Sequence, residues 1–376
     1  MLLFVKYMNS TKKNEGKYLY YLFMVLLVLV CTFRYRVGGD SLHYHDIFDS
    51  YPKFSELSSY DFQNSQYNFG WIIFNAAIKS ICDSFYFFQF IHAFIINTAI
   101  FYFIKKYTIN KFLTIIFYLF FNFLYFNMEV LRESLAVSFF LVSIPYLLNK
   151  KWLTYYLLCL LAYSFHSSAF ILFVLPLFAI EIKVKYQISI LILLTLLINF
   201  VPIGDLISNY LGFLSVTQVA SRNYLNKDIN VGGILAQMLK IIPILFIFII
   251  YKRKKLNHQF AIFVMPYLVL GTLSSFIPGV YRFLNYLIIP ILIFAVDLCY
   301  FFLRRKHKYI FSYYKVVGSL CLLILMQLQY FTRDMAKFSQ VNSVFFDLYI
   351  PYHSILDEKK DSTREKMFYN SMNIDN

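Results

Sequence analysis

The amino-acid sequence predicts an all-α, polytopic integral membrane protein with about 11 transmembrane helices. Three observations lead to this fold class. The chain of 376 residues is 60% hydrophobic and only 15% charged, whereas a soluble domain is about 45–50% apolar and about 25% charged. Its mean hydropathy is +0.60. Apolar runs that approach the length needed to cross a bilayer, about 17–25 residues, follow one another along most of the chain.

The first apolar run covers residues 18–33. No small-residue cleavage site follows it, so we expect a retained first span rather than a signal peptide that is removed. A polar loop over residues 34–68 comes next. It contains Gly38 and Gly39, and this pair lets the backbone turn tightly or approach a ligand because neither residue carries a Cβ atom.

The apolar stretch after this loop is interrupted by charged residues. We interpret residues 69–82 as a re-entrant or interfacial segment and residues 84–104 as the true span, because irregular backbone is tolerated at membrane depth where it lines a cavity. The predicted organisation is one polytopic domain over residues 1–331, followed by a polar tail over residues 332–376. The remaining predicted spans are residues 112–126, 130–148, 152–165, 168–180, 186–203, 232–251, 260–277, 280–303 and 309–331.

Lysine and arginine gather near the ends of these spans, and placing every such cluster in the cytoplasm sets the orientation. The N-terminus is then inside, whereas the loops over residues 34–68 and 204–231 and the tail are outside. The scheme also requires a hairpin that turns at residues 166–168. Its helical arms are only about 20 Å long, in a hydrocarbon core of about 30 Å. The turn should therefore lie below the outer surface.

Residues that are rare in lipid gather on the outer side of this topology. Four of them are arginines: Arg34, Arg132, Arg222 and Arg282. Each has an ordinary explanation, and Arg132 in particular can form an intrahelical ion pair with Glu129. Together they favour an anionic, phosphate-bearing ligand, because guanidinium matches phosphate in a bidentate fork and stays charged in a low dielectric. We expect the neighbouring Arg36 to tolerate substitution better.

Two residues are the main candidates for a catalytic base. His166, at the hairpin turn, is the first, because an unperturbed pKa of about 6.5 leaves much of a histidine neutral and burial favours that form further. Asp40 is the second, although facing several arginines it is better suited to orient them. Cysteine pairs of the CxxC type and histidines or carboxylates with metal-ligand spacing are absent from the sequence, so we expect neither a metal nor a cofactor.

Six short motifs follow one another along nearly the whole chain. They are Phe33-Arg34-x3-Gly38-x-Asp40-x3-Tyr44-x3-Phe48, Arg132-Glu133-Ser134-Leu135-Ala136, Phe165-His166-Ser167-Ser168-Ala169, Ser221-Arg222-Asn223-Tyr224, Tyr281-Arg282 and Pro351-Tyr352. In type and order they resemble the EpsG-like branch of bacterial O-antigen, capsule and exopolysaccharide polymerases (the Wzy type). The chain departs from the family pattern at Asn68, where an acidic residue is expected.

The resemblance implies a fold like that of membrane glycosyltransferases (GT-C-like). It also implies a polymerase that moves a growing glycan from undecaprenyl diphosphate to a hydroxyl of an incoming lipid-linked repeat unit, at the outer face of the bacterial cytoplasmic membrane. Motif tyrosines Tyr44, Tyr224 and Tyr281 would join the arginines in binding this substrate. Implied partners are the lipid-linked oligosaccharide, membrane lipid, a flippase and a chain-length regulator, with no nucleic acid. The alternatives are a lipid-linked oligosaccharide flippase or transporter, an O-antigen ligase and a membrane acyltransferase.

Overall fold

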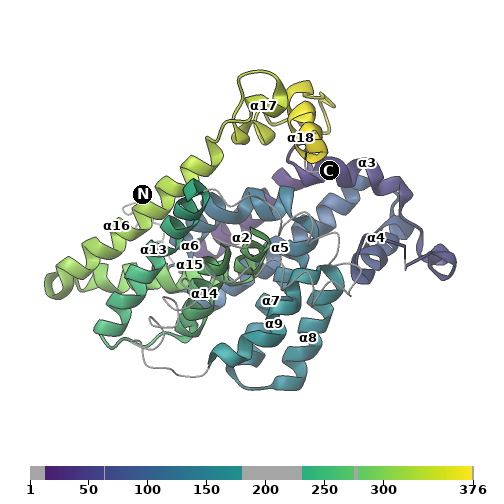
Figure 1. Cartoon of the computed structure of the whole chain (residues 1–376). Helices are drawn as coiled ribbons and strands as arrows, with labels where there is room; N and C mark the ends of the chain where they lie inside the picture. The colour runs from purple at the N-terminus through teal and green to yellow at the C-terminus, as the bar shows by residue number, and fades with distance from the viewer. Residues whose placement is uncertain (1–12, 63, 180–230, 275–277, 375–376) are drawn as a thin grey trace. The chain divides into compact units, whose positions relative to one another are not determined.

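Helices joined by loops make up the described part of the chain (Figure 1). Within it there are two isolated antiparallel bridges and no β-strand, so the all-α prediction is confirmed for these residues. The chain divides into two units, Met1–Phe170 with Gln327–Asn376, and Ile171–Met326. The computed structural model describes residues 13–62, 64–179, 231–274 and 278–374.

The first unit holds most of the N-terminal half of the chain and its C-terminal tail. The helices before residue 110 are α2 (Lys13–Thr32), α3 (Asp40–Ile47), η1 (Phe48–Ser50), η2 (Phe54–Ser59), α4 (Phe69–Ile81) and α5 (Phe85–Tyr107). Those that follow are α6 (Lys111–Tyr118), η3 (Leu119–Phe123), η4 (Tyr125–Glu129), α7 (Leu131–Leu148), α8 (Trp152–Phe165) and η5 (Ser167–Phe170). The tail adds α17 (Ala336–Ser339), η9 (Phe345–Leu348) and α18 (Ser362–Ile374).

Buried polar side chains link helices of this unit. The hydroxyl of Tyr20 in α2 donates to the carbonyl of Phe101 in α5, at 2.6 Å. Asn97 in α5 donates to the Asn127 side chain at 2.8 Å and accepts from the Tyr118 hydroxyl at 3.0 Å. In an apolar surrounding each of these groups needs such a partner. The Asn97–Asn127 bond fixes the end of the α6–η3–η4 segment against α5.

In its described residues the second unit contains seven helical segments and most of an eighth. They are α9 (Ile171–Val174), η6 (Leu175–Ala179), α13 (Val231–Arg253), η7 (Gln259–Phe263), α14 (Val264–Ser274), η8 (Pro278–Val280), α15 (Tyr281–Arg304) and α16 (Lys306–Phe331), whose last turn belongs to the first unit. Helices α13 and α14 approach closely at Gly271, where a Cβ atom would lie 2.9 Å from Cγ1 of Ile241.

Four of the described helices, α5, α7, α15 and α16, are long and apolar enough to cross a membrane, and several shorter apolar helices accompany them. Helix α4 has 13 residues and is therefore about 20 Å long, too short for a hydrocarbon core of about 30 Å. Its bounds agree with those expected for the re-entrant or interfacial segment, which stays a prediction. The predicted span over residues 186–203 lies outside the described residues, so the total of about 11 spans also stays a prediction.

Basic side chains lie at one end of the first unit. Lys105 at the end of α5 donates to the hydroxyl of Tyr21 at 2.5 Å, and Lys17 and Lys111 are close enough to act on the same tyrosine. At the other end of α5, the side-chain amide of Gln89 donates to the carbonyl of Arg34 at 3.2 Å. The lysines and the loop after α2 are thus at opposite ends of the helices, as the predicted orientation requires.

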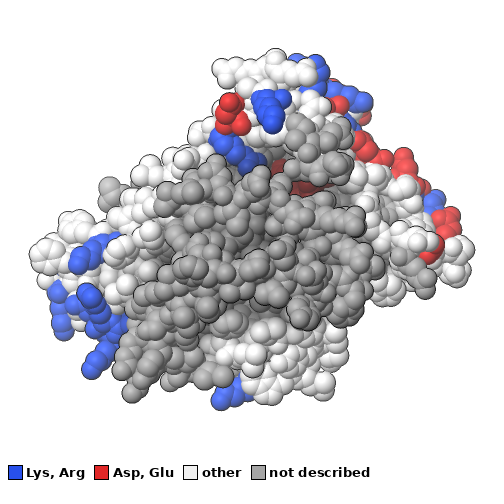
Figure 2. Space-filling view, viewed as in Figure 1, with Lys and Arg blue, Asp and Glu red and all other residues white. Residues whose placement is uncertain are grey.

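The C-terminal tail packs on this same loop. The backbone N–H of Tyr35 donates to the carbonyl of His353 at 2.8 Å, and that of Ile355 donates to the carbonyl of Phe33 at 2.9 Å. Acidic and basic side chains lie over α3 and the tail on the face shown in Figure 2. Because they are in contact, the tail and the loop over residues 34–68 lie at the same end of the first unit.

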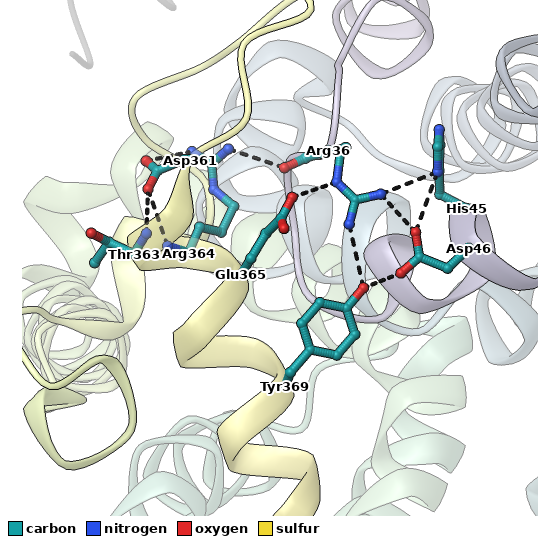
Figure 3. A network of polar contacts seen from close by, with 8 residues as sticks. All are labelled: Arg36, His45, Asp46, Asp361, Thr363, Arg364, Glu365 and Tyr369. Atoms are coloured by element: carbon teal, nitrogen blue, oxygen red, sulfur yellow. Dashed lines mark hydrogen bonds and ion pairs between the residues drawn. The ribbon is translucent and has the colours of Figure 1, made fainter.

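Arg36 is the centre of the polar contacts between loop and tail (Figure 3). It donates to Asp46 at 2.7 Å and to Glu365 of α18 at 2.5 Å, and its own side chain is only 8% exposed. Burial raises the pKa of Asp46, but hydrogen bonds from Arg36 and Tyr369 outweigh it and hold that pKa below its usual value. The sequence analysis expected Arg36 to tolerate substitution well. These contacts instead predict that its substitution destabilises the protein.

Replacing Arg36 with methionine should lower the free energy of unfolding by about 2–3 kcal/mol, because two carboxylates lose a charged donor. The matched control is Lys53→Met. Lys53 pairs with Asp83 at 3.1 Å, but both side chains are more than 40% exposed, so the loss should be below about 1 kcal/mol. Thermal unfolding of the detergent-solubilised variants measures both effects. Equal losses would contradict a structural role for Arg36.

Candidate active site

The start of α3 is built around a close approach between Gly39 and Glu129. The backbone N–H of Gly39 donates to Oε1 of Glu129 at 2.6 Å, and a Cβ atom on Gly39 would lie only 2.2 Å from Oε2. Gly38, with a φ of +101°, turns the chain here and donates its N–H to the carbonyl of Leu348 in the tail. The glycine pair thus allows the close approach predicted from the sequence, and the group that approaches is a carboxylate of the protein itself.

Arg132, the second residue of α7, faces tyrosines. Its Nε donates to the hydroxyl of Tyr44 at 2.6 Å, and its guanidinium lies 4.8 Å from the ring centre of Tyr67. His43 is 2.9 Å from the Tyr67 hydroxyl. No ion pair joins Arg132 to Glu129 among the described residues, so the intrahelical pair considered above is wrong. Tertiary packing gives each of the two a different partner.

Asp40 is the first residue of α3 and lies among these groups. Its charge acts on Tyr44, Glu129 and Arg132. Burial of Glu129 and the charge of Asp40 raise the pKa of the Glu129 carboxyl group to about 8, although hydrogen bonds from Gly39 and Tyr349 lower it. Asp40 is therefore close enough to interact with both Glu129 and Arg132.

Arg34 is buried, at 1% exposure. Its Nη1 donates to the carbonyl of Cys31 at 2.5 Å, whereas Nε and Nη2 have no hydrogen-bond partner in the part of the chain that the structure describes. Glu129 is near enough to act on its charge. A buried guanidinium with two unused donor atoms is suited to bind an anion.

His92 of α5 is a further buried residue near Arg34, and sequence reasoning missed it. Its Nε2 lies 2.9 Å from the carbonyl of Leu131, whereas Nδ1 has no partner among the described residues. Since a carbonyl only accepts, Nε2 carries the proton. The sequence did contain a signal for His92, an isolated histidine inside an apolar segment. Such residues are costly in a membrane and usually functional.

His166 follows the last residue of α8 and is buried. The chain turns here, as predicted. Its Nδ1 accepts from the backbone N–H of Ser168 at 3.2 Å and lies 2.6 Å from the Ser168 hydroxyl. These contacts form a local turn after the helix. They neither test nor support a role for His166 as a base, which stays a prediction.

The other predicted site residues lie elsewhere. Tyr281 and Arg282 begin α15 in the second unit, at the end opposite Arg304. Arg222 and Tyr224 lie outside the described residues. A group of three or more histidines, cysteines or acidic residues that could hold a metal ion does not occur within the described ranges.

The comparisons with known proteins place the chain in one family. A profile of the EpsG family matches residues 17–354, a range that includes all the motifs named above and the tail up to Ser354. Searches of curated proteins and of solved structures find no match. The chain belongs to the EpsG family, and this membership indicates a membrane protein with a polysaccharide polymerase type of function.

Proposed function

We propose that the protein polymerises a bacterial surface polysaccharide at the outer face of the cytoplasmic membrane. A growing glycan is transferred from undecaprenyl diphosphate to a hydroxyl group of an incoming lipid-linked repeat unit. Family membership supports the reaction type. The observation that carries the site is the pair Arg34 and Arg132, since neither guanidinium forms an ion pair with a carboxylate among the described residues. Arg34 lies near enough to Glu129, and Arg132 near enough to Asp40, for their charges to interact.

In this reaction the arginines bind the diphosphate. Negative charge develops on the departing diphosphate oxygen in the transition state, and fixed guanidinium groups stabilise it without reorganisation. Arg34 offers two unused donor atoms, and Arg132 is oriented by the Tyr44 hydroxyl. The sequence prediction that Tyr281, Arg282, Arg222 and Tyr224 also bind the substrate stays a prediction, since the first two belong to the second unit and the last two lie outside the described residues.

Purified protein in vesicles with one lipid-linked repeat unit as its substrate tests the function. A polymerase produces a ladder of longer glycans that remain on the lipid carrier. A flippase forms no new glycosidic bond, and a ligase or an acyltransferase does not lengthen the carrier-bound chain. In cells that lack the protein, carriers with a single repeat unit should accumulate; long unattached chains would instead identify a ligase.

The proposed orientation predicts which residues a membrane-impermeant thiol reagent reaches in intact cells. Ser55 and Lys254 are both exposed, so a cysteine at either position can react if it faces the reagent. Cys82 and Cys321 are also exposed and are first replaced by serine to remove background. Labelling is expected at position 55 only. Labelling only at position 254 would invert the topology and overturn the outer location of the site.

A further inference from the structure

The proton released by the acceptor hydroxyl needs a base, and the arrangement around Glu129 supplies one. We propose that Glu129 is the catalytic base of the transfer, with Asp40 and Tyr349 as positioning residues. This assignment rests on the proposed polymerase function and gives the role to Glu129 instead of His166.

The contacts of Glu129 leave its carboxylate able to accept a proton from a substrate hydroxyl group. A carboxylate has about four acceptor sites; the Gly39 N–H and the Tyr349 hydroxyl occupy two of them. The residue is half-buried rather than enclosed, so a hydroxyl group can reach it. Arg34, whose unpartnered Nε and Nη2 are fully buried, lies close enough for their charges to interact. The base and the anion-binding arginine are thus neighbours.

The two carboxyl groups of this cluster differ in their surroundings. Asp40 is in the first turn of α3, where the helix dipole stabilises a negative charge, and it acts on Arg132. Glu129 faces Asp40 and Tyr349, with the positive charge of Arg333 further away. Such a pair separates the roles of its members: Asp40 orients Arg132, while Glu129 takes up and releases a proton.

The transfer forms one glycosidic bond and breaks the bond between the donor glycan and its carrier. Glu129 takes the proton of the acceptor hydroxyl while that oxygen bonds to the anomeric carbon of the donor glycan. The bond from this carbon to the diphosphate oxygen breaks, and its electron pair leaves with undecaprenyl diphosphate, whose charge the arginines neutralise. The proton on Glu129 is released to water before the next transfer.

Glu129→Gln is the main test, because the glutamine oxygen still accepts from the Gly39 N–H but the side chain cannot take a proton. Polymerisation in the vesicle assay should fall by about 10²–10⁴-fold. The matched control is Glu56→Gln, which changes an exposed carboxylate in the loop over residues 34–68. Glu129→Asp should retain part of the activity. Folding raises the pKa of the Glu129 carboxyl group from 4.5 to about 8, so the folded protein favours the protonated form. The stabilisation from this protonation is fully present below pH 4.5 and is lost as the pH rises to 8. The glutamine variant should therefore be at least as stable as wild type at pH 7.5.

The pH profile separates a base from a structural residue. Wild-type activity should rise with pH through a midpoint near 8. Asp40→Asn removes a like charge and should shift this midpoint to lower pH, whereas Tyr349→Phe removes a stabilising donor and should shift it to higher pH. Profiles that keep their midpoint in both variants, or a Glu129→Gln protein with near-normal activity, would overturn the assignment. If His166→Gln is inactive while Glu129→Gln is still active, His166 is the base and not Glu129. An inactive wild-type protein would instead overturn the polymerase function itself.

Discussion

Arg132→Lys should reduce polymer formation by about 10²–10³-fold, the loss seen when one transition-state donor is removed, while the protein accumulates normally in the membrane. Lysine keeps the charge but has neither the planar fork that binds a diphosphate nor the flat face that packs on an aromatic ring. In this protein Arg132 uses both properties, since its Nε bonds to Tyr44 and its guanidinium packs over Tyr67.

The matched control for this substitution is Arg253→Lys. Arg253 is exposed at the end of α13, beyond the apolar part of that helix, so the exchange should leave activity within about twofold, because surface substitutions away from special contacts change little. Tyr44→Phe removes the hydroxyl that orients Arg132 and should give an intermediate loss. Normal chain length from both Arg132→Lys and Arg34→Lys would refute the binding of the diphosphate by these arginines.

Gly38→Ala should have the second large effect, a loss of folded protein. At its φ of +101° a side chain is strained, at a cost of about 1–3 kcal/mol. The added Cβ atom would also lie 2.7 Å from Cβ and 2.8 Å from the carbonyl oxygen of Met128, which adds about 1–3 kcal/mol of overpacking. Together these cost about 2–6 kcal/mol, which reaches the lower end of the stability of a typical domain, about 5–15 kcal/mol. Membrane abundance and thermal unfolding measure the loss.

Gly39→Ala should behave differently, because its Cβ atom would meet the carboxylate end of Glu129 rather than backbone. The side chain can move away, so the protein should fold but lose activity as the Gly39–Glu129 hydrogen bond breaks. Gly318→Ala is the control, since nothing lies within 4 Å of its Cβ position. Equal behaviour of all three variants would contradict the close approach at the start of α3.

The apolar runs of the sequence predicted several of the apolar helices, but not the polar helices α3, α17 and α18, which lie in the predicted loop and tail. The predicted run over residues 152–165 is α8, the run over residues 130–148 is α7 to within one residue, and the break before α5 separates two helices as expected. Transfer of a segment into lipid depends on its own side chains and length. This property depends only on the local sequence and can therefore be predicted from it. The same is true of the arginines that gather in the loops beside these segments.

Tertiary structure alone decided which partners these loop residues have. Glu129 binds Gly39, 90 residues away in the sequence, although Arg132, only three residues away, was a possible partner by sequence spacing. Arg36 binds Glu365 at a separation of 329 residues, and this bond joins the tail to the loop after α2. Charged groups can pair with any suitable group that folding brings near, so sequence spacing does not determine the pairing. The sequence by itself therefore determined the apolar helices and the kinds of residue in the loops, whereas packing decided that Glu129 lies close to Asp40 and Arg34, and Asp40 close to Arg132.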